Sequence, residues 1–242
     1  MVAIIPWGSG ATATYSPPST NLLAQFDASD TANYNAGTGV WTPTAGSAGI
    51  NLQYQTTGGS TGGFSLSGTA QNGYLPINVP TAYEFRPVST SGGTVTEITI
   101  TVAYRVNTYA GGQLFNFVRS GGSVTMGLYV DSTSLAQLNY TDVGNPVTAT
   151  LTDLNSGDGS FRIASMMYDA GTTGLILFNR EGTTSTVGSM ASYTNAVYPM
   201  HTSASWAEAG DLDVCEVLVH GTPNPGTMVA AIVYLQQKWS ET

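Results

Sequence analysis

The segment TEITITVAYRV, residues 96–106, alternates apolar and more polar side chains without interruption. Because successive side chains of a strand point to opposite faces, this two-residue period predicts a β-strand with one face in a core. The apolar set is Ile98, Ile100, Val102, Tyr104 and Val106, and the opposite set is Glu97, Thr99, Thr101, Ala103 and Arg105.

Further segments of the same kind follow at regular spacing. They are separated by Gly, Asn and Asp clusters such as SGG, NSGDG and REG, which are typical of hairpin turns. Because no helix long enough for a crossover interrupts them, the sequence predicts an all-β sandwich or barrel of antiparallel strands. The predicted strands are 112–119, 123–131, 134–140, 146–153, 161–169, 174–180 and 212–220.

The end of the chain has a different period. In PGTMVAAIVYLQQKW, residues 225–239, large apolar side chains recur at steps of four, three and four residues, which predicts one helical stripe. Asn224 is a favourable N-cap, and Pro225 suits the first helical position. We therefore expect one short helix docked on the sandwich. Its stripe consists of Met228, Ile232, Leu235 and Trp239.

The composition indicates a large core and a surface with few charges. Hydrophobic residues make up 41% of the 242 residues, whereas charged residues make up only 9%. The net charge of -9 repels phosphate and anionic lipid, which disfavours nucleic-acid binding. The single cysteine, Cys215, can form no internal disulfide, and we expect it to be buried and inert.

The first 20 residues, MVAIIPWGSGATATYSPPST, combine Pro, Gly and Ser with apolar side chains such as Ile4, Ile5 and Trp7. We expect residues 1–20 to form an extended assembly arm that packs on its own body or on a neighbouring subunit. Residues 21–242 are predicted to form one sandwich domain. The start lacks the basic leader of a signal peptide and no segment reaches membrane length, so the expected location is extracellular or on a virion surface, without membrane insertion.

Segments from both ends of the chain carry a family resemblance. EVLVH to YLQQKW (216–239) stands at one end, and LLAQFDASD (22–30) with GVWTPTAGSAGINLQ (39–53) at the other. ITITVAYRV (98–106) and GLILFNREG (174–182) lie between them. The segment 216–239 resembles the final strand and helix of concanavalin A-like, laminin G-like lectin domains, and 22–30 with 39–53 resembles their N-terminal strand and Trp-containing turn. The segment 98–106 resembles their long concave strand, and 174–182 resembles one of their hairpins. The resemblance implies a jelly roll of two antiparallel sheets with one C-terminal helix.

That family includes carbohydrate-binding modules, adhesion domains, viral surface proteins and some hydrolases, so the fold alone selects no function. Its laminarinase-type glycosidases carry Glu-x-Asp-x-x-Glu, which DLDVCE (211–216) resembles, with Asp211 in place of the nucleophile. In a regular strand Asp211 and Asp213 lie opposite Glu216, so a catalytic pair requires a bulge. We therefore expect no enzyme activity, and we expect Asp211 and Asp213 to cap the strand entry in solvent.

Two oxygen-rich loops, FDASD and TDLNSGDGS, are candidate calcium sites. Neither matches an EF-hand, since Gly157 occupies a ligand position, and such residues also stabilise turns. No cofactor is the first expectation, and calcium is the alternative. His201 and His220 lack a nucleophile motif or zinc spacing and are expected to be structural. The candidate metal ligands are Asp27, Asp30, Asp153, Asn155 and Asp158.

Sugar binding needs exposed aromatic side chains beside polar groups, and the alternative for each aromatic is packing in the core or at an edge. Candidates lie on the predicted concave strand and at nearby strand ends. They are Tyr104, Arg105, Asn107, Tyr109, Tyr129 and Tyr140.

The leading hypothesis is a non-enzymatic, lectin-like structural protein on the surface of a virus or phage particle, such as a decoration, spike or fibre component. Its expected partners are other structural subunits, as a homo-oligomer or with capsid or tail proteins, and host glycans. The low-charge, hydroxyl-rich composition and the apolar arm motivate this hypothesis. The alternative is a free carbohydrate-binding or adhesion protein, and a glycoside hydrolase is the third class.

Overall fold

The structure is a computed structural model that describes residues 16–47, 50–88, 96–109, 112–119, 125–130, 135–142, 145–152, 159–169, 173–180, 184–192, 197–198, 210–222 and 224–240. Between residues 109 and 210 it describes side chains only for Leu114, residues 159–167 and Asp169. Several predicted site residues therefore lie outside the described part. These are Ile4, Ile5, Trp7, Asp153, Asn155, Asp158 and His201, together with the side chains of Tyr109, Tyr129 and Tyr140.

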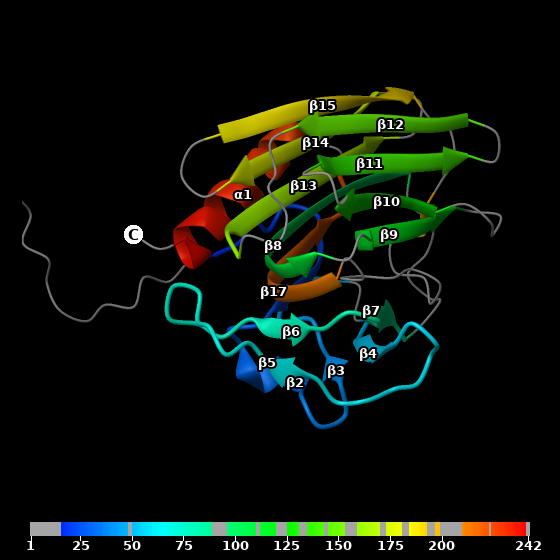
Figure 1. The fold of residues 1–242 in the computed structure, drawn as a ribbon. Coiled ribbons are helices and arrows are strands. Elements are labelled where there is room, and N and C mark those ends of the chain that lie inside the picture. Colours follow the sequence, from blue (N-terminus) through cyan, green and yellow to red (C-terminus); the bar gives the residue numbers. More distant parts are fainter. Residues whose placement is uncertain are drawn as a thin grey trace, which may run out of the picture.

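The fold is a sandwich of antiparallel strands, as the sequence predicts (Figure 1). One layer has eight strands, with β8 (Glu97–Tyr109) and β17 (Gly210–His220) adjacent in it. The order is β15 (Thr184–Ser192), β14 (Thr173–Arg180), β13 (Phe161–Asp169), β8, β17, β6 (Ile77–Val79) and β5 (Ser65–Leu66), and β1 (Leu22–Asp27) also pairs with β17.

The facing layer contains two groups of strands. The first group runs in the order β12 (Asn145–Thr152), β11 (Leu135–Asp142), β10 (Thr125–Val130), β9 (Gly112–Arg119) and β16 (Val197–Tyr198). The second runs β2 (Tyr34–Asn35), β3 (Val40–Trp41), β4 (Leu52–Thr56) and β7 (Tyr83–Pro87). The predicted hairpins that join β9 to β10, β10 to β11, β11 to β12 and β13 to β14 are therefore confirmed, with boundaries that shift by one or two residues. The hairpin predicted at NSGDG is wrong, because β12 and β13 lie in different sheets.

The main core lies between the two layers. A small interior cavity is lined by Trp41 and Leu52 from the four-stranded group, Leu114 from the five-stranded group, and Val102 and Val217 from the eight-stranded sheet. All five side chains are at most 5% exposed. The apolar face of β8 belongs to this core, because its alternating residues from Ile98 to Val106 are at most 3% exposed.

Helix α1 (Pro225–Trp239) covers the other face of the eight-stranded sheet and contacts β13, β8 and β17. Asn224 caps it as predicted, since its side chain accepts hydrogen bonds from the backbone of Gly226 and Thr227. The predicted stripe of Met228, Ile232, Leu235 and Trp239 is at most 3% exposed. Within the described ranges, no helix is long and apolar enough to cross a membrane.

Both faces of β8 are covered by other elements, which bears on the candidate sugar contacts Tyr104 and Arg105. Tyr104 is a candidate sugar contact on the predicted concave strand, with core packing as the alternative, and the alternative holds, because Tyr104 is 1% exposed and points into the core between the layers. Arg105 points to the opposite face and is 7% exposed. Neither side chain is available as an exposed sugar platform, because packed elements cover the strand on both sides.

Candidate functional site

The DLDVCE segment of β17 places two carboxylates on one face of the sheet. The pairing of β17 with β8 shifts register at Cys215, so that Asp213 lies opposite Arg105 and Glu216 opposite Ala103. Arg105 and Ala103 are two residues apart and therefore share a face of β8. The bulge at Cys215 consequently brings Asp213 and Glu216 to that same face. The bulge that a catalytic pair requires is present, and the surroundings of the two carboxylates decide what they do.

Glu216 is completely buried beneath α1, where donors occupy both of its oxygens. Its Oε1 accepts hydrogen bonds from Gln25 Nε2 at 2.7 Å and from the Tyr234 hydroxyl at 2.8 Å. Its Oε2 accepts from Lys238 Nζ at 2.8 Å and from Trp239 Nε1 at 2.9 Å. Four donors around one carboxylate satisfy its hydrogen-bonding capacity inside the protein.

Lys238 joins this carboxylate to a second one. Its Nζ lies 2.5 Å from Asp27 Oδ2 and 2.8 Å from Glu216 Oε2, and it sits 5.2 Å from the centre of the Trp239 ring. Burial and the neighbouring Asp27 raise the pKa of Glu216, while the Lys238 ammonium opposes that rise. These contacts fasten α1 to β1 and β17, so their first role is structural.

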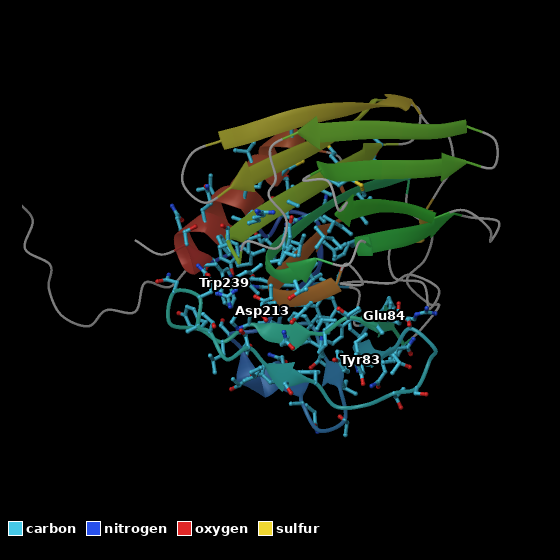
Figure 2. All side chains as sticks on the ribbon, viewed as in Figure 1. Tyr83, Glu84, Asp213 and Trp239 are labelled. Atoms are coloured by element: carbon cyan, nitrogen blue, oxygen red, sulfur yellow. The ribbon has the colours of Figure 1, made fainter. Side chains whose placement is uncertain are left out.

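Asp213 forms a separate buried cluster and is 1% exposed. Its Oδ2 lies 2.6 Å from Arg105 Nη2 and accepts a hydrogen bond from Ser67 Oγ at 2.8 Å. Asn78 Nδ2 donates to Asp213 Oδ1 at 3.1 Å and to Asp211 Oδ1 at 2.7 Å. The expectation that Asp213 caps the strand in solvent is therefore wrong. Asp213 instead ties β17 to β8 and to the β5–β6 hairpin (Figure 2).

The two predicted calcium ligands that the structure describes already have protein partners. Asp27 accepts hydrogen bonds from the backbone and hydroxyl of Ser29 and pairs with Lys238. Asp30 caps the short 3-10 helix η1 (Thr31–Asn33) and accepts from Asn33 Nδ2 at 2.6 Å. Among the described residues, no three His, Cys, Asp or Glu side chains gather as a metal site would require. Calcium binding stays a prediction without support from these two residues.

An open hollow of about 200 Å³ lies between η1 and the β5–β6 hairpin, and it combines aromatic, aliphatic and hydroxyl groups. The side chains that matter for its chemistry are Ser29, Thr31, Tyr34, Leu66, Tyr74 and Leu75. No charged side chain is among its lining residues.

Each tyrosine ring of the hollow packs against a second aromatic ring. The Tyr34 ring lies 5.5 Å from the Phe64 ring, and the Tyr74 ring lies 5.5 Å from the Trp239 ring in an edge-on arrangement. Burial raises the pKa of Tyr34, so its hydroxyl stays protonated at neutral pH and can both donate and accept. The hollow thus offers two aromatic rings on fixed supports beside neutral hydroxyls.

The end of α1 holds both walls of the hollow. One wall of the hollow contains Ala28 and Ser29, and Asp27, which directly precedes them in the chain, pairs with Lys238 Nζ. On the other side, the Lys238 carbonyl accepts from Asn72 Nδ2 at 2.6 Å, and the Trp239 carbonyl accepts from Gln71 Nε2 at 2.8 Å. Gln71 and Asn72 directly precede the Gly73, Tyr74 and Leu75 wall. One helix end therefore sets the separation of the two walls.

Sequence reasoning missed Tyr34 and Tyr74, the tyrosines of this hollow. Both lie in short irregular segments where no two-residue period marks a face. The available signal was the Asn72–Gly73 pair, which adopts positive φ angles of 45° and 81° and turns the chain just before Tyr74. Of the predicted sugar contacts, Asn107 is half-buried and does not line the hollow.

No protein-family model and no curated protein sequence matches the chain. Its fold does resemble solved structures. Domain 4 of AbnA, a GH43 extracellular arabinanase from Geobacillus stearothermophilus in complex with arabinotriose, matches with a TM-score of 0.55 and 9% identity, covering 88% of this chain and 100% of that one.

Two other structures show a similar likeness. The binding domain of botulinum neurotoxin DC in complex with SialylT has a TM-score of 0.55 and 6% identity over 88% of this chain and 51% of that one. Trypanosoma rangeli sialidase in complex with 2,3-difluorosialic acid has a TM-score of 0.53 and 9% identity over 99% of this chain and 36% of that one. The chain thus spans about half of the toxin domain and about a third of the sialidase. These likenesses support the β-sandwich fold.

Proposed function

We propose that the chain is a non-catalytic carbohydrate-binding domain that holds a sugar in the hollow between Tyr34 and Tyr74. The observation that carries this proposal is the pairing of two braced tyrosine rings with hydroxyl groups in one open, uncharged hollow. A sugar has apolar C–H faces that pack on aromatic rings and a rim of hydroxyls that hydrogen-bond to neutral polar groups. The complexes of the arabinanase domain with arabinotriose and of the toxin domain with SialylT support this class of ligand.

The absence of catalysis is part of the proposal. Retaining glycosidases need two carboxyl groups roughly 5 to 5.5 Å apart on either side of an accessible bond. Glu216 and Asp213 are 0% and 1% exposed and are held by Lys238 and Arg105. A sugar cannot reach either carboxylate without displacing α1 or the β5–β6 hairpin, so we assign both to stability.

A glycan array followed by calorimetric titration tests the proposal. Tyr74→Ala should lower the affinity for the best glycan at least about tenfold, equal to about 1.4 kcal/mol, because it removes one ring of the hollow. Tyr74→Phe should lose less, since it keeps the ring. Tyr83→Ala is the matched control, because Tyr83 is a partly buried tyrosine that stacks on Tyr54 outside the hollow.

Two outcomes would sink the proposal. One is a wild-type protein that binds no glycan at millimolar concentration. The other is glycan binding that Tyr74→Ala and Tyr83→Ala leave equally strong, which would place the sugar elsewhere on the domain.

As the biological setting of this binding domain, we propose the surface of a virus or phage particle, with a free adhesion protein as the alternative. The low content of charged residues, 9%, and the apolar segment near the start of the chain support this setting. The two settings differ in one observation: a particle component is found in purified particles, and a free lectin is not.

A further inference from the structure

Helix α1 carries an apolar strip on the side turned away from the sheet. Val229 and Val233 are 50% and 43% exposed, whereas the other large apolar side chains of the helix are buried. They border an open groove of about 430 Å³. Its lining includes Ser16, Pro18, Val229, Ala230, Val233 and Gln237.

The second wall of this groove is the beginning of the described chain, Ser16 and Pro18. The position of Pro18 is fixed by His220, whose Nε2 lies 2.9 Å from the Pro18 carbonyl oxygen and donates to it. His220 is completely buried at the end of β17. The segment that precedes Ser16 therefore begins at the groove itself.

The sequence of that segment suits an apolar groove. Residues 2–7, VAIIPW, are apolar throughout, and residues 8–15, GSGATATY, connect them to the groove wall. Residues 1–20 contain no charged side chain, and none lines the groove. Contact between residues 2–7 and the groove therefore requires no charged side chain to lose its hydration.

The length of residues 2–7 also matches the length of the groove along α1. Six extended residues span about 20 Å, and the helix from Gly226 to Gln237 spans roughly 17 Å. The eight connecting residues can reach up to roughly 26 Å, which is enough to turn back along the helix. Because the two partners are tethered, their effective concentration is on the order of millimolar, which favours the chain's own segment over that of another copy.

We propose that residues 2–7 dock in this groove of the same chain, where Ile5 and Trp7 cover Val229 and Val233. The arm then serves as a strap over the outer face of α1.

Disulfide trapping tests this docking in the full-length chain. With Ile5→Cys and Val233→Cys together, mild oxidation should give a rapid intramolecular crosslink, seen as a shifted monomer band on a non-reducing gel. Cys215 is completely buried and does not interfere. The control pair, Ile5→Cys with Thr81→Cys, uses an exposed position outside the groove and should crosslink slowly.

Two results of the trapping experiment would overturn the proposal. Equal rates for the two pairs would show that the segment has no preferred site. A crosslinked dimer, formed between differently tagged chains, would show that the groove takes the segment of a second copy instead.

Iodide quenching gives an independent readout. The fluorescence of Trp7 is obtained as the difference between the wild type and Trp7→Phe. It should be shielded in the wild type and at least about threefold more quenchable in Val229→Asp/Val233→Asp, which changes only exposed side chains and should leave the circular dichroism spectrum unchanged. Equal quenching in both proteins would contradict docking.

Discussion

Glu216 is the residue at which a structural role and a catalytic role make opposite predictions. Glu216→Gln keeps the size of the side chain but replaces one acceptor oxygen with a donor amide. Lys238 and Trp239 both donate to Oε2, and Gln25 and Tyr234 both donate to Oε1, so whichever oxygen becomes the NH2 group, donors then face a donor. Because the change also breaks a buried ion pair, it should lower the free energy of unfolding by about 3 to 5 kcal/mol, measured by urea denaturation.

Asp211→Asn is the matched control, because Asp211 belongs to the same hexapeptide but is only half-buried and accepts a hydrogen bond from Asn78. It should cost less than about 1 kcal/mol. If Glu216→Gln kept its stability but abolished a hydrolytic activity on β-glucans, the structural assignment would be wrong.

Sequence patterns located the residues of this region but not their surroundings. Alternation assigned Tyr104 and Arg105 to opposite faces of one strand, which is correct. It could not show that the second layer covers one face, and that α1 with the connection between β5 and β6 covers the other. The bulge at Cys215 has no local signature either, because it depends on the pairing of β17 with β8 across more than 100 residues. Long-range packing, rather than local preference, decides what the DLDVCE carboxylates do.

Helix α1 joins the hydrophobic core to the candidate sugar site through Trp239. This side chain is completely buried, donates to Glu216 and packs against the Tyr74 ring. Trp239→Ala should therefore cost about 3 to 5 kcal/mol and lower the melting temperature. It should also weaken glycan binding in the calorimetric titration, because Tyr74 loses the ring behind it.

Val233→Ala shortens an exposed side chain on the same helix and should change the stability by less than about 1 kcal/mol. A Trp239→Ala protein that melts at the temperature of the wild type would show that the docking of α1 contributes little.

The elements that could be predicted are those long enough to repeat a period. β8 has 13 residues and α1 has 15, so the spacing of apolar side chains repeats several times along each element. β2 and β3 have two residues each, too few to show any period. β15, TSTVGSMAS, is long enough but mostly Ser, Thr and Gly, and its pairing with β14 supplies the order that its own side chains do not indicate. The candidate hollow lies among the short elements, which is why the sequence did not reveal it.

The stability of the whole domain should depend on pH through His220. Burial lowers its pKa, and the hydrogen bond to Pro18 opposes this. Below the ordinary value of about 6.5 the unfolded chain therefore binds a proton that the folded chain does not bind. The contribution of His220 is complete above about pH 6.5 and is lost as the pH falls toward the lowered pKa.

Melting curves between about pH 5 and 8 check this expectation. His220→Gln retains an amide donor for the Pro18 carbonyl but cannot titrate, so the fall in stability on acidification should become shallower than in the wild type. The same slope in both proteins would assign the pH dependence to other groups.

The position of β1 has a consequence for the synthesis of the protein. β1 pairs with β17, and Asp27 contacts Lys238 across 211 positions of the chain. At a translation rate of roughly 5 to 20 residues per second, β1 leaves the ribosome roughly 10 to 40 s before β17 does. During that time its apolar side chains, Ala24 and Phe26, have no native strand to pair with. The nascent chain therefore cannot complete its eight-stranded sheet until translation reaches β17, and chains that stop earlier would expose β1 to aggregation.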